Sequence, residues 1–321
     1  MGLRVVFMGT PEFAVATLET LVKSPHKVVA VVTVPDKPAG RGQKIQYSAV
    51  KDYAITQELP VLQPEKLKDE LFLEQLSAFN ADIFVVVAFR MLPVEVWSMP
   101  RLGAINLHGS LLPQYRGAAP INWAIINGEE ETGVTTFFIQ KEIDTGNILF
   151  SEKIAVEPNN TAGDIYDKLM VVGASLVSKT LNSIERHQIK AIHQTQLIGK
   201  NDILKPAPKI FKDDCRIQWN KSTHDIHNLI RGLSPYPTAW TILHDKHFEN
   251  KISLKVFYAE MKADNVKQKP GTIITDGKKL LQVVTTDGVI EIKILQAEGK
   301  KKLNVEEFLR GFHGIENYSF E

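Results

Sequence analysis

The sequence predicts an α/β protein in which a Rossmann-like domain with a mostly parallel sheet precedes a small C-terminal β-barrel domain. In the first part of the chain, Val-rich runs alternate with segments of helical spacing, as in doubly wound sheets. In the last third, short β-rich runs follow one another, as in small barrels. A length of 321 residues also suits two hydrophobic cores better than one.

The first domain is expected to open with a strand, a tight turn and a helix. Leu3–Met8 is apolar, and Glu12–Val22 has helical spacing. Between them, Thr10 is the expected N-cap and Pro11 the first helical residue. Neither G-x-G-x-x-G nor G-x-x-x-x-G-K-[ST] follows the strand, so dinucleotide and triphosphate binding are not favoured.

The elements that follow alternate in the same way. Apolar and β-branched runs predict three further strands, at Lys27–Val34, Ala81–Phe89 and Thr132–Ile139. Helical spacing predicts three more helices, over Tyr47–Leu59, over Ala118–Ile126 and from Thr161 onward. The sequence Thr161-x-x-Asp164 has the form of an N-terminal capping box. We expect the first domain to span residues 1–189 and a linker to span residues 190–208.

The second domain, residues 209–321, is expected to begin with a helix capped by Ser222 and to continue as a barrel. Its β-rich runs are Trp240–Leu243, Ile252–Glu260, Gly271–Thr275 and Lys279–Gln296. Asp287-Gly288 interrupts the last run and predicts a hairpin turn. His224 and His227 lie three apart on the expected helix, but no third and fourth ligand is evident, so we expect no metal site.

Composition excludes several classes of protein. The chain is 44% hydrophobic and 23% charged, as in ordinary globular proteins. Cys215 is the only cysteine, which excludes an intrachain disulfide and a multi-cysteine metal site. The N-terminus resembles neither a signal peptide nor a membrane-spanning helix, so we expect a cytoplasmic protein that does not bind membranes.

Charge is distributed unevenly between the two parts. Residues 1–203 carry 19 Lys and Arg against 22 Asp and Glu, whereas residues 204–321 carry 19 against 15. This charge asymmetry fits either an ordinary solvated surface or a domain that binds phosphate groups.

Residues 103–120, reading GAINLHGSLLPQYRGAAP, contain the strongest candidate site. On an extended strand, Asn106 and His108 point to the same face, and the Gly-rich turn after them offers backbone donors and acceptors. A lone histidine at a strand end is more often structural than functional. Asp144, in the turn sequence Ile143-Asp-Thr-Gly146, is equally weak evidence when taken alone.

Residues 35–44 contain two prolines, two glycines, three basic residues and no apolar run, which predicts a flexible surface loop. Its basic residues are Lys37, Arg41 and Lys44. The densest basic run of the chain is Lys300-Lys301-Lys302. From composition alone, a solvated loop and a phosphate-binding loop are both open for each segment.

The Asn106-x-His108 pair, the SLLPQYRGAAP run and the later Asp144-Thr-Gly together resemble the catalytic segments of the folate-dependent formyltransferase family. The resemblance implies that Asn106, His108 and Asp144 surround a formyl carbon, and that the donor is 10-formyltetrahydrofolate, with no metal. It also implies contacts with this donor from two segments: Ala88, Phe89, Arg90 and Leu92, and Ser110, Leu111, Leu112 and Pro113.

The resemblance is strongest to the family members that act on tRNA. In these, a basic insertion corresponding to residues 35–44 enters the acceptor end, and Arg41 falls at its key arginine. The second domain is then an OB-like barrel that lines a basic channel. A monomer that formylates the α-amine of initiator methionyl-tRNA is the expected function. Formyl transfer to an amino sugar or a purine precursor, hydrolysis of the formyl donor, and tRNA binding without catalysis are the alternatives.

Overall fold

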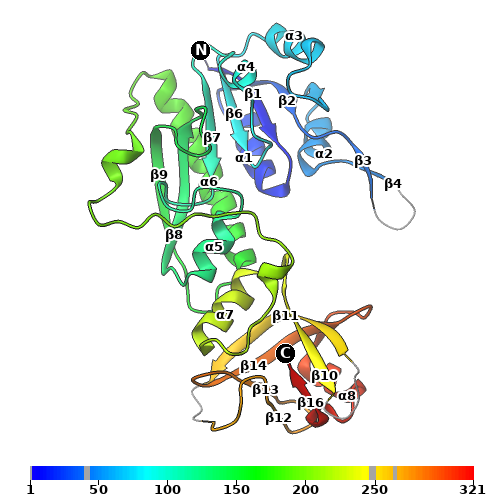
Figure 1. Cartoon of the computed structure of the whole chain (residues 1–321). Coiled ribbons are helices and arrows are strands. Elements are labelled where there is room, and N and C mark those ends of the chain that lie inside the picture. The colour runs from blue at the N-terminus through cyan, green and yellow to red at the C-terminus, as the bar shows by residue number, and fades with distance from the viewer. Residues whose placement is uncertain (1, 40–43, 246–250, 263–265) are drawn as a thin grey trace. The chain divides into compact units, whose positions relative to one another are not determined.

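The computed structural model describes residues 2–39, 44–245, 251–262 and 266–321 (Figure 1). The chain forms two compact units. The first comprises Met1–Pro120, Thr132–Ile154 and Tyr166–Ala207; the second comprises Ile121–Glu131, Ala155–Ile165 and Pro208–Glu321. Two short segments from the first half of the chain therefore pack with the C-terminal part.

A seven-stranded sheet forms the centre of the first unit and confirms the predicted Rossmann-like fold. In spatial order its strands are β5 (Val61–Leu62), β2 (Lys27–Val32), β1 (Arg4–Gly9), β6 (Ile83–Val87), β7 (Ala104–His108), β8 (Glu131–Phe138) and β9 (Ile148–Ala155). The strands from β5 to β7 are parallel, and β8 runs antiparallel to β7. The chain moves outward from β1 to β2 and later returns on the other side as β6. Ligands of open α/β sheets bind beyond the carboxyl ends of the strands at such a switch point.

Helices connect these strands: α1 (Glu12–Val22), α2 (Ala49–Thr56), α3 (Glu70–Ala78), α4 (Val94–Trp97) and the long α6 (Ala162–Glu185). The capping box at the start of α6 is confirmed, because the Asp164 amide donates to the Thr161 hydroxyl and the Thr161 amide donates to the Asp164 carboxylate. The predicted cap of α1 is wrong. Pro11 itself is the N-cap, in an extended conformation and without a side-chain cap, so the helix begins at Glu12.

At the segment predicted to be a loop, residues 37–39 and 44–46 form a short two-stranded ribbon. Strand β3 (Lys37–Ala39) pairs antiparallel with β4 (Lys44–Gln46), with Lys37 opposite Gln46. The Lys37 side chain is exposed. Arg41 lies outside the described residues, and only the backbone of Lys44 is described.

The second unit is a nearly closed antiparallel barrel, as predicted. Its strands, in chain order, are β10 (Ala239–Asp245), β11 (Lys251–Lys262), β12 (Ile273–Thr275), β13 (Leu281–Val284), β14 (Val289–Ala297), β15 (Leu303–Asn304) and β16 (Tyr318–Phe320). The sheet runs β12-β13-β14-β11-β10-β16. It closes where the Phe320 amide donates to the Gly271 carbonyl at 2.9 Å. Only glycine fits there, because a Cβ on Gly271 would lie 2.3 Å from the Phe320 oxygen.

Three helices belong to this unit: α5 (Pro120–Ile126), which joins it through residues 121–126, α7 (Thr223–Gly232) and α8 (Val305–Gly311). Short 3-10 turns occur at Gln194–Leu197 in the first unit and at Asp213–Cys215 and Ile315–Asn317 in the second. Ser222 caps α7 as predicted, accepting from the Asp225 amide. The turn at Asp287-Gly288 joins β13 to β14, with the Thr285 amide donating to Gly288, so the predicted hairpin is confirmed.

Candidate active site

Asn106 and His108 lie near the carboxyl end of β7 on one face of the first sheet. The alternate residues Ile105 and Leu107 are buried, and Leu107 packs against α6 at Gly173. A Cβ on Gly173 would lie 2.7 Å from a Leu107 methyl group, so the glycine lets the helix approach the strand closely. Because side chains alternate along a strand, Asn106 and His108 point to the face opposite this helix. Asn106 is half-buried, and His108 is only 7% exposed.

Two further residues fix the ring of His108. Its Nε2 lies 2.8 Å from the Tyr115 carbonyl oxygen, and its Nδ1 lies 3.7 Å from Oδ2 of Asp144. A carbonyl only accepts hydrogen bonds, so Nε2 must carry a proton. In the neutral ring Nδ1 is then the basic atom, and it faces the carboxylate. The distance of 3.7 Å is too long for a direct hydrogen bond, so the Asp144 carboxylate acts on this atom through its charge.

Asp144 is delivered by the loop between β8 and β9 in a left-handed backbone conformation, with φ of 56°. Its Oδ2 accepts a hydrogen bond of 2.9 Å from the amide of Gly117. The sequence analysis did not single out Tyr115 or Gly117, although both belong to the turn after β7. The site therefore joins one strand end to two loops that lie far apart in the sequence.

Comparison with known proteins shows the family to which the chain belongs. Residues 3–181 match the formyl transferase family, and residues 209–313 match the formyl transferase C-terminal domain. A methionyl-tRNA formyltransferase of Bacteroides fragilis is 51% identical over 319 residues, which cover 99% of this chain and 98% of that protein. One of Flavobacterium johnsoniae is 52% identical, covering 96% of each chain. The chain belongs to the methionyl-tRNA formyltransferase family.

Solved structures of more distant proteins share the fold of this formyltransferase. An N-formyltransferase from Helicobacter canadensis, in complex with folinic acid and dTDP-3-aminofucose, has a TM-score of 0.65 at 22% identity; the match covers 94% of this chain and 100% of that one. HypX from Aquifex aeolicus, in complex with tetrahydrofolic acid, has a TM-score of 0.63 at 18% identity, with 96% of this chain and 47% of that one covered.

The segment Ser110–Pro113 of the formyltransferase is largely internal. Ser110 is fully buried and its hydroxyl donates to the backbone of Gln114. Leu112 is 4% exposed and packs with Phe137 and Ile148. Leu111 and Pro113 are half-buried. Ser110 and Leu112 therefore shape the loop from within. The Leu112 amide donates to the Thr135 hydroxyl, which donates to the Ser110 carbonyl, so Leu111, Pro113 and the remaining backbone groups are the ones available to a ligand.

The segment Ala88–Leu92 follows β6 at the switch point of the sheet. Ala88 is exposed and left-handed, with φ of 47°, whereas Leu92 is part of the core. Arg90 donates from both Nη atoms to the carbonyls of Pro64 and Glu65. Its Nε is buried without a hydrogen-bond partner, and burial lowers the pKa of its guanidinium. Phe89 is partly buried and packs against the core. The centre of its ring lies 5.3 Å from the guanidinium carbon of Arg90.

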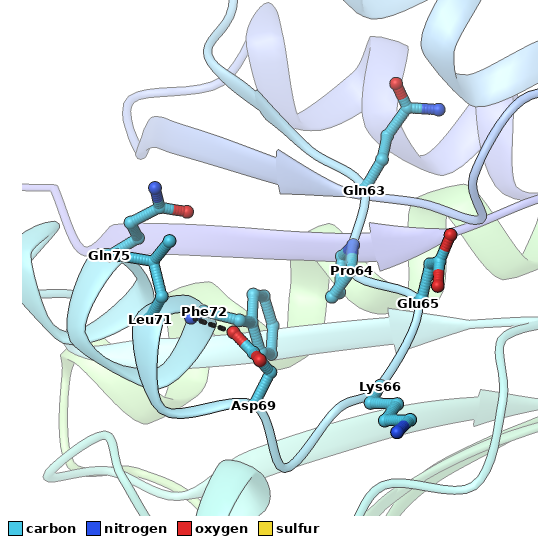
Figure 2. A pocket seen from close by; sticks show the side chains of 8 residues that line it. All are labelled: Gln63, Pro64, Glu65, Lys66, Asp69, Leu71, Phe72 and Gln75. Carbon is cyan, nitrogen blue, oxygen red and sulfur yellow. Dashed lines mark hydrogen bonds between the residues drawn. The ribbon is translucent and has the colours of Figure 1, made fainter.

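A cavity of about 430 Å³ lies beside this segment but contains none of the three catalytic candidates. Figure 2 shows its two walls: the chain at residues 63–66 on one side, and Leu71, Phe72 and Gln75 of α3 on the other. Asp69 caps α3 at the rim by accepting from the Phe72 amide. The two bonds from Arg90 to residues 64 and 65 tie one wall of the cavity to the end of β6.

The basic candidates outside the catalytic loops are solvent-accessible where they are described. Lys37 is exposed on β3, and Lys300, Lys301 and Lys302 are exposed between β14 and β15. Lys302 also lies 4.9 Å from the centre of the Phe257 ring.

His227 is buried in α7, and within the described ranges no group of three His, Cys, Asp or Glu side chains could hold a metal ion. No helix in the described part of the chain is long and apolar enough to cross a membrane.

Proposed function

We propose that the enzyme transfers the formyl group of 10-formyltetrahydrofolate to the α-amine of methionine on initiator tRNA. The observation that carries this proposal is the contact of His108 with Asp144, on the strand that also bears Asn106, in a chain 51% identical to a methionyl-tRNA formyltransferase over 99% of its length. Because translation begins in the cytoplasm, we expect the enzyme to act there, as a monomer.

The reaction requires a tetrahedral intermediate and the transfer of one proton. The neutral amine nitrogen attacks the formyl carbon, and the carbonyl oxygen becomes an oxyanion. The bond from carbon to N10 of the folate then breaks, and its electron pair remains on N10. The amine loses one proton and N10 gains one, so tetrahydrofolate and the formylated amine are the only products.

Asn106 fits the role of oxyanion donor, because its amide can donate from the same face as His108. A donor aimed at such an oxygen contributes roughly 3 kcal/mol to transition-state stabilisation. His108 has Nε2 committed to the Tyr115 carbonyl, so we assign proton transfer to Nδ1. Asp144 faces this nitrogen and stabilises the imidazolium that forms when the amine proton arrives.

The residues at the carboxyl end of β6 fit a folate ring. Ala88 leaves the backbone exposed, and the unpartnered Nε of Arg90 offers a buried donor that a polar ring can satisfy. We assign ring contacts to Ala88, Phe89 and Arg90, with Leu92 supporting them from the core. On the other side, the contacts come from Leu111, Pro113 and the backbone of Ser110 and Leu112.

The tRNA is proposed to contact the two basic segments. Lys37, Arg41 and Lys44 belong to the ribbon segment, and Lys300, Lys301 and Lys302 to the β14–β15 loop. Arginine offers a planar set of donors that suits a phosphate or a base edge, and lysine offers a mobile charge. Most of the binding free energy is then expected to depend on salt concentration.

Product analysis tests the proposed function. The purified enzyme is incubated with charged initiator tRNA and 10-formyltetrahydrofolate, the ester is hydrolysed, and the released amino acid is examined by mass spectrometry. We expect N-formylmethionine and tetrahydrofolate in equal amounts. Free formate with unmodified methionine would instead indicate a hydrolase, and no turnover would indicate either a binding protein or an enzyme with another amine acceptor.

A further inference from the structure

We propose that Gln194 is a positioning residue for catalysis, and that residues 192–207 hold both catalytic loops in register. This connecting segment leaves α6 and runs past the site within the first unit. The kinetic test of this inference rests on the proposed formyl transfer. The hydrogen bonds from which the inference is argued do not depend on that proposal.

Gln194 uses all of its hydrogen-bonding capacity on the two catalytic loops. Its Nε2 donates to the carbonyl oxygens of Asp144 at 2.9 Å and Gly146 at 2.8 Å. Its Oε1 accepts from Nε of Arg116 at 3.0 Å and from Nη2 at 2.6 Å. Since arginine only donates and carbonyls only accept, the orientation of this amide is fixed by its partners. The side chain is 1% exposed, so water does not replace these bonds.

The residues on either side of Arg116 are those that contact the catalytic side chains. The Tyr115 carbonyl accepts from His108, and the Gly117 amide donates to Asp144. Gln194 therefore links the two loops at a second point, behind the His108–Asp144 contact. Its two bonds to the backbone around Asp144 also stabilise the left-handed conformation of that residue, which is otherwise unfavourable.

The rest of the connecting segment fixes the Tyr115 loop. The Tyr115 amide donates to the Lys205 carbonyl at 2.7 Å, and the Ala207 amide donates to the Arg116 carbonyl at 2.8 Å. Gly117 has φ of 128°, and a Cβ there would lie 2.3 Å from the Ala207 oxygen. The close approach of the two backbones thus leaves the loop one conformation in which Tyr115 and Gly117 face the site.

Glutamine is required at position 194 because no other side chain of this size offers two donors and an acceptor. Gln194→Ala removes all four bonds, and Gln194→Glu keeps the volume and the acceptor but replaces the amide nitrogen, with both donors, by one oxygen atom that faces two carbonyls. Displacement of a catalytic group by about 1 Å lowers turnover by up to roughly a hundredfold. We therefore expect kcat to fall by about tenfold to a hundredfold in both variants, with KM for tRNA and folate changed by less than about threefold.

Asn228 of α7, in the second unit, provides a matched control. It is 2% exposed, its Oδ1 accepts from Nε of Arg231 at 2.8 Å, and its amide nitrogen lies 3.3 Å from Nδ1 of His224 on the same helix. Asn228→Ala should lower the melting temperature, with kcat retained within about threefold. If Gln194→Ala does not fold, the comparison is made with Gln194→Glu.

The experiment measures kcat and KM of each variant together with amide hydrogen exchange at Gly117 by NMR. Loss of Gln194 should speed exchange at Gly117, because Asp144 is no longer held against its amide, whereas Asn228→Ala should not. Normal kcat and unchanged exchange in a folded Gln194 variant would overturn the inference, as would an equal fall in kcat in the control. A wild-type enzyme without activity would contradict the proposed function, while the exchange measurement would still decide whether Gln194 positions Asp144.

Discussion

The backbone conformation of Asp144 shows how the proposed catalytic residues depend on their surroundings. A left-handed φ of 56° is uncommon for a residue other than glycine, and here it directs the carboxylate toward Nδ1 of His108 and the Gly117 amide. Gly146 follows Asp144 by two residues, and a Cβ there would lie 1.6 Å from the Phe138 oxygen, so the loop must approach β9 through a glycine. The charge that assists His108 is thus placed by the backbone.

His108→Ala and Asp144→Asn should each lower kcat by about a hundredfold or more, since the first removes the proton acceptor and the second its stabilising charge. The binding of charged tRNA should change little, because neither side chain belongs to the basic segments. Steady-state kinetics and tRNA affinity are measured for both variants. Turnover within about threefold of the wild type in either variant would exclude that residue from the chemistry.

His227 makes the C-terminal unit sensitive to acid. Burial, with the nearby positive charge of Arg231, lowers the pKa of His227 from its usual value of 6.5 to about 4. The folded state therefore favours the neutral ring, and the unfolded state binds the proton first as pH falls. The contribution to stability is full above pH 6.5 and is lost progressively between pH 6.5 and pH 4.

Lowering the pH from 6.5 to 5 should decrease the unfolding free energy of the C-terminal unit by roughly 2 kcal/mol through His227. His227→Gln should remove most of this dependence, whereas His224→Gln, on the exposed side of the same helix, should keep it. Urea unfolding of the two variants and the wild type at both pH values gives the comparison. A pH dependence that persists in His227→Gln would show that another group is responsible.

Among the structural elements, the β3–β4 ribbon carries the most specific tRNA prediction. Arg41→Ala should lower kcat/KM on charged tRNA by roughly tenfold, the effect of losing one fork-like contact worth about 1 to 3 kcal/mol. Lys37→Ala should have a smaller effect, since an exposed lysine supplies only a mobile charge. Kinetics at fixed salt and a melting curve are recorded for each. Unchanged kinetics with a lower melting temperature in Arg41→Ala would make the ribbon a structural element.

Substitutions in the β14–β15 loop are expected to change the salt dependence of tRNA affinity rather than the rate of formyl transfer. Replacing Lys300, Lys301 and Lys302 with alanine should flatten the slope of log affinity against log salt by up to about 2 to 3, if each lysine meets one phosphate. The control is a variant with Lys278 and Lys279 replaced, which are exposed in the turn between β12 and β13. An identical slope in the triple variant and the wild type would remove this loop from the tRNA interface.

How well each element could be predicted depends on how local its cause is. Asn106 and His108 could be placed on one face because the period of a strand is two residues, and the caps at Thr161 and Ser222 are set within three residues. The N-cap of α1 was predicted one residue too early, at Thr10 instead of Pro11, because both Thr and Pro are common where helices begin. The ribbon was missed because its composition is that of a loop, and its strands form only through mutual pairing.

The supports of the active site could not be predicted because they join distant parts of the sequence. Gly117 meets Asp144 across 27 residues, and Gln194 meets the same residue across 50. Gln194 stands in a polar stretch that reads as a linker, with no pattern that distinguishes it from a solvated residue. Only the fold shows that it is buried between two loops.

At the scale of the whole molecule, the chain combines a Rossmann-like unit with a barrel unit, but the second unit is not made of the C-terminal sequence alone. Asn122 donates to the Gly232 carbonyl, and the Gly163 amide donates to Ser234. Residues 121–131 and 155–165 therefore stabilise this unit. A truncation at residue 207 would remove their packing partners, so substitutions test tRNA binding more cleanly than truncation does.

The central claim is that the enzyme recognises methionine as part of a tRNA, and one comparison of acceptors tests it most directly. The values of kcat/KM for formylation of charged initiator tRNA and of methionine methyl ester are measured with the same folate donor and at the same salt concentration. Because phosphate contacts from the basic segments are available only to the tRNA, its kcat/KM should be higher by about a thousandfold or more. Equal values for the two acceptors, or faster reaction of a nucleotide-linked amino sugar, would contradict the account.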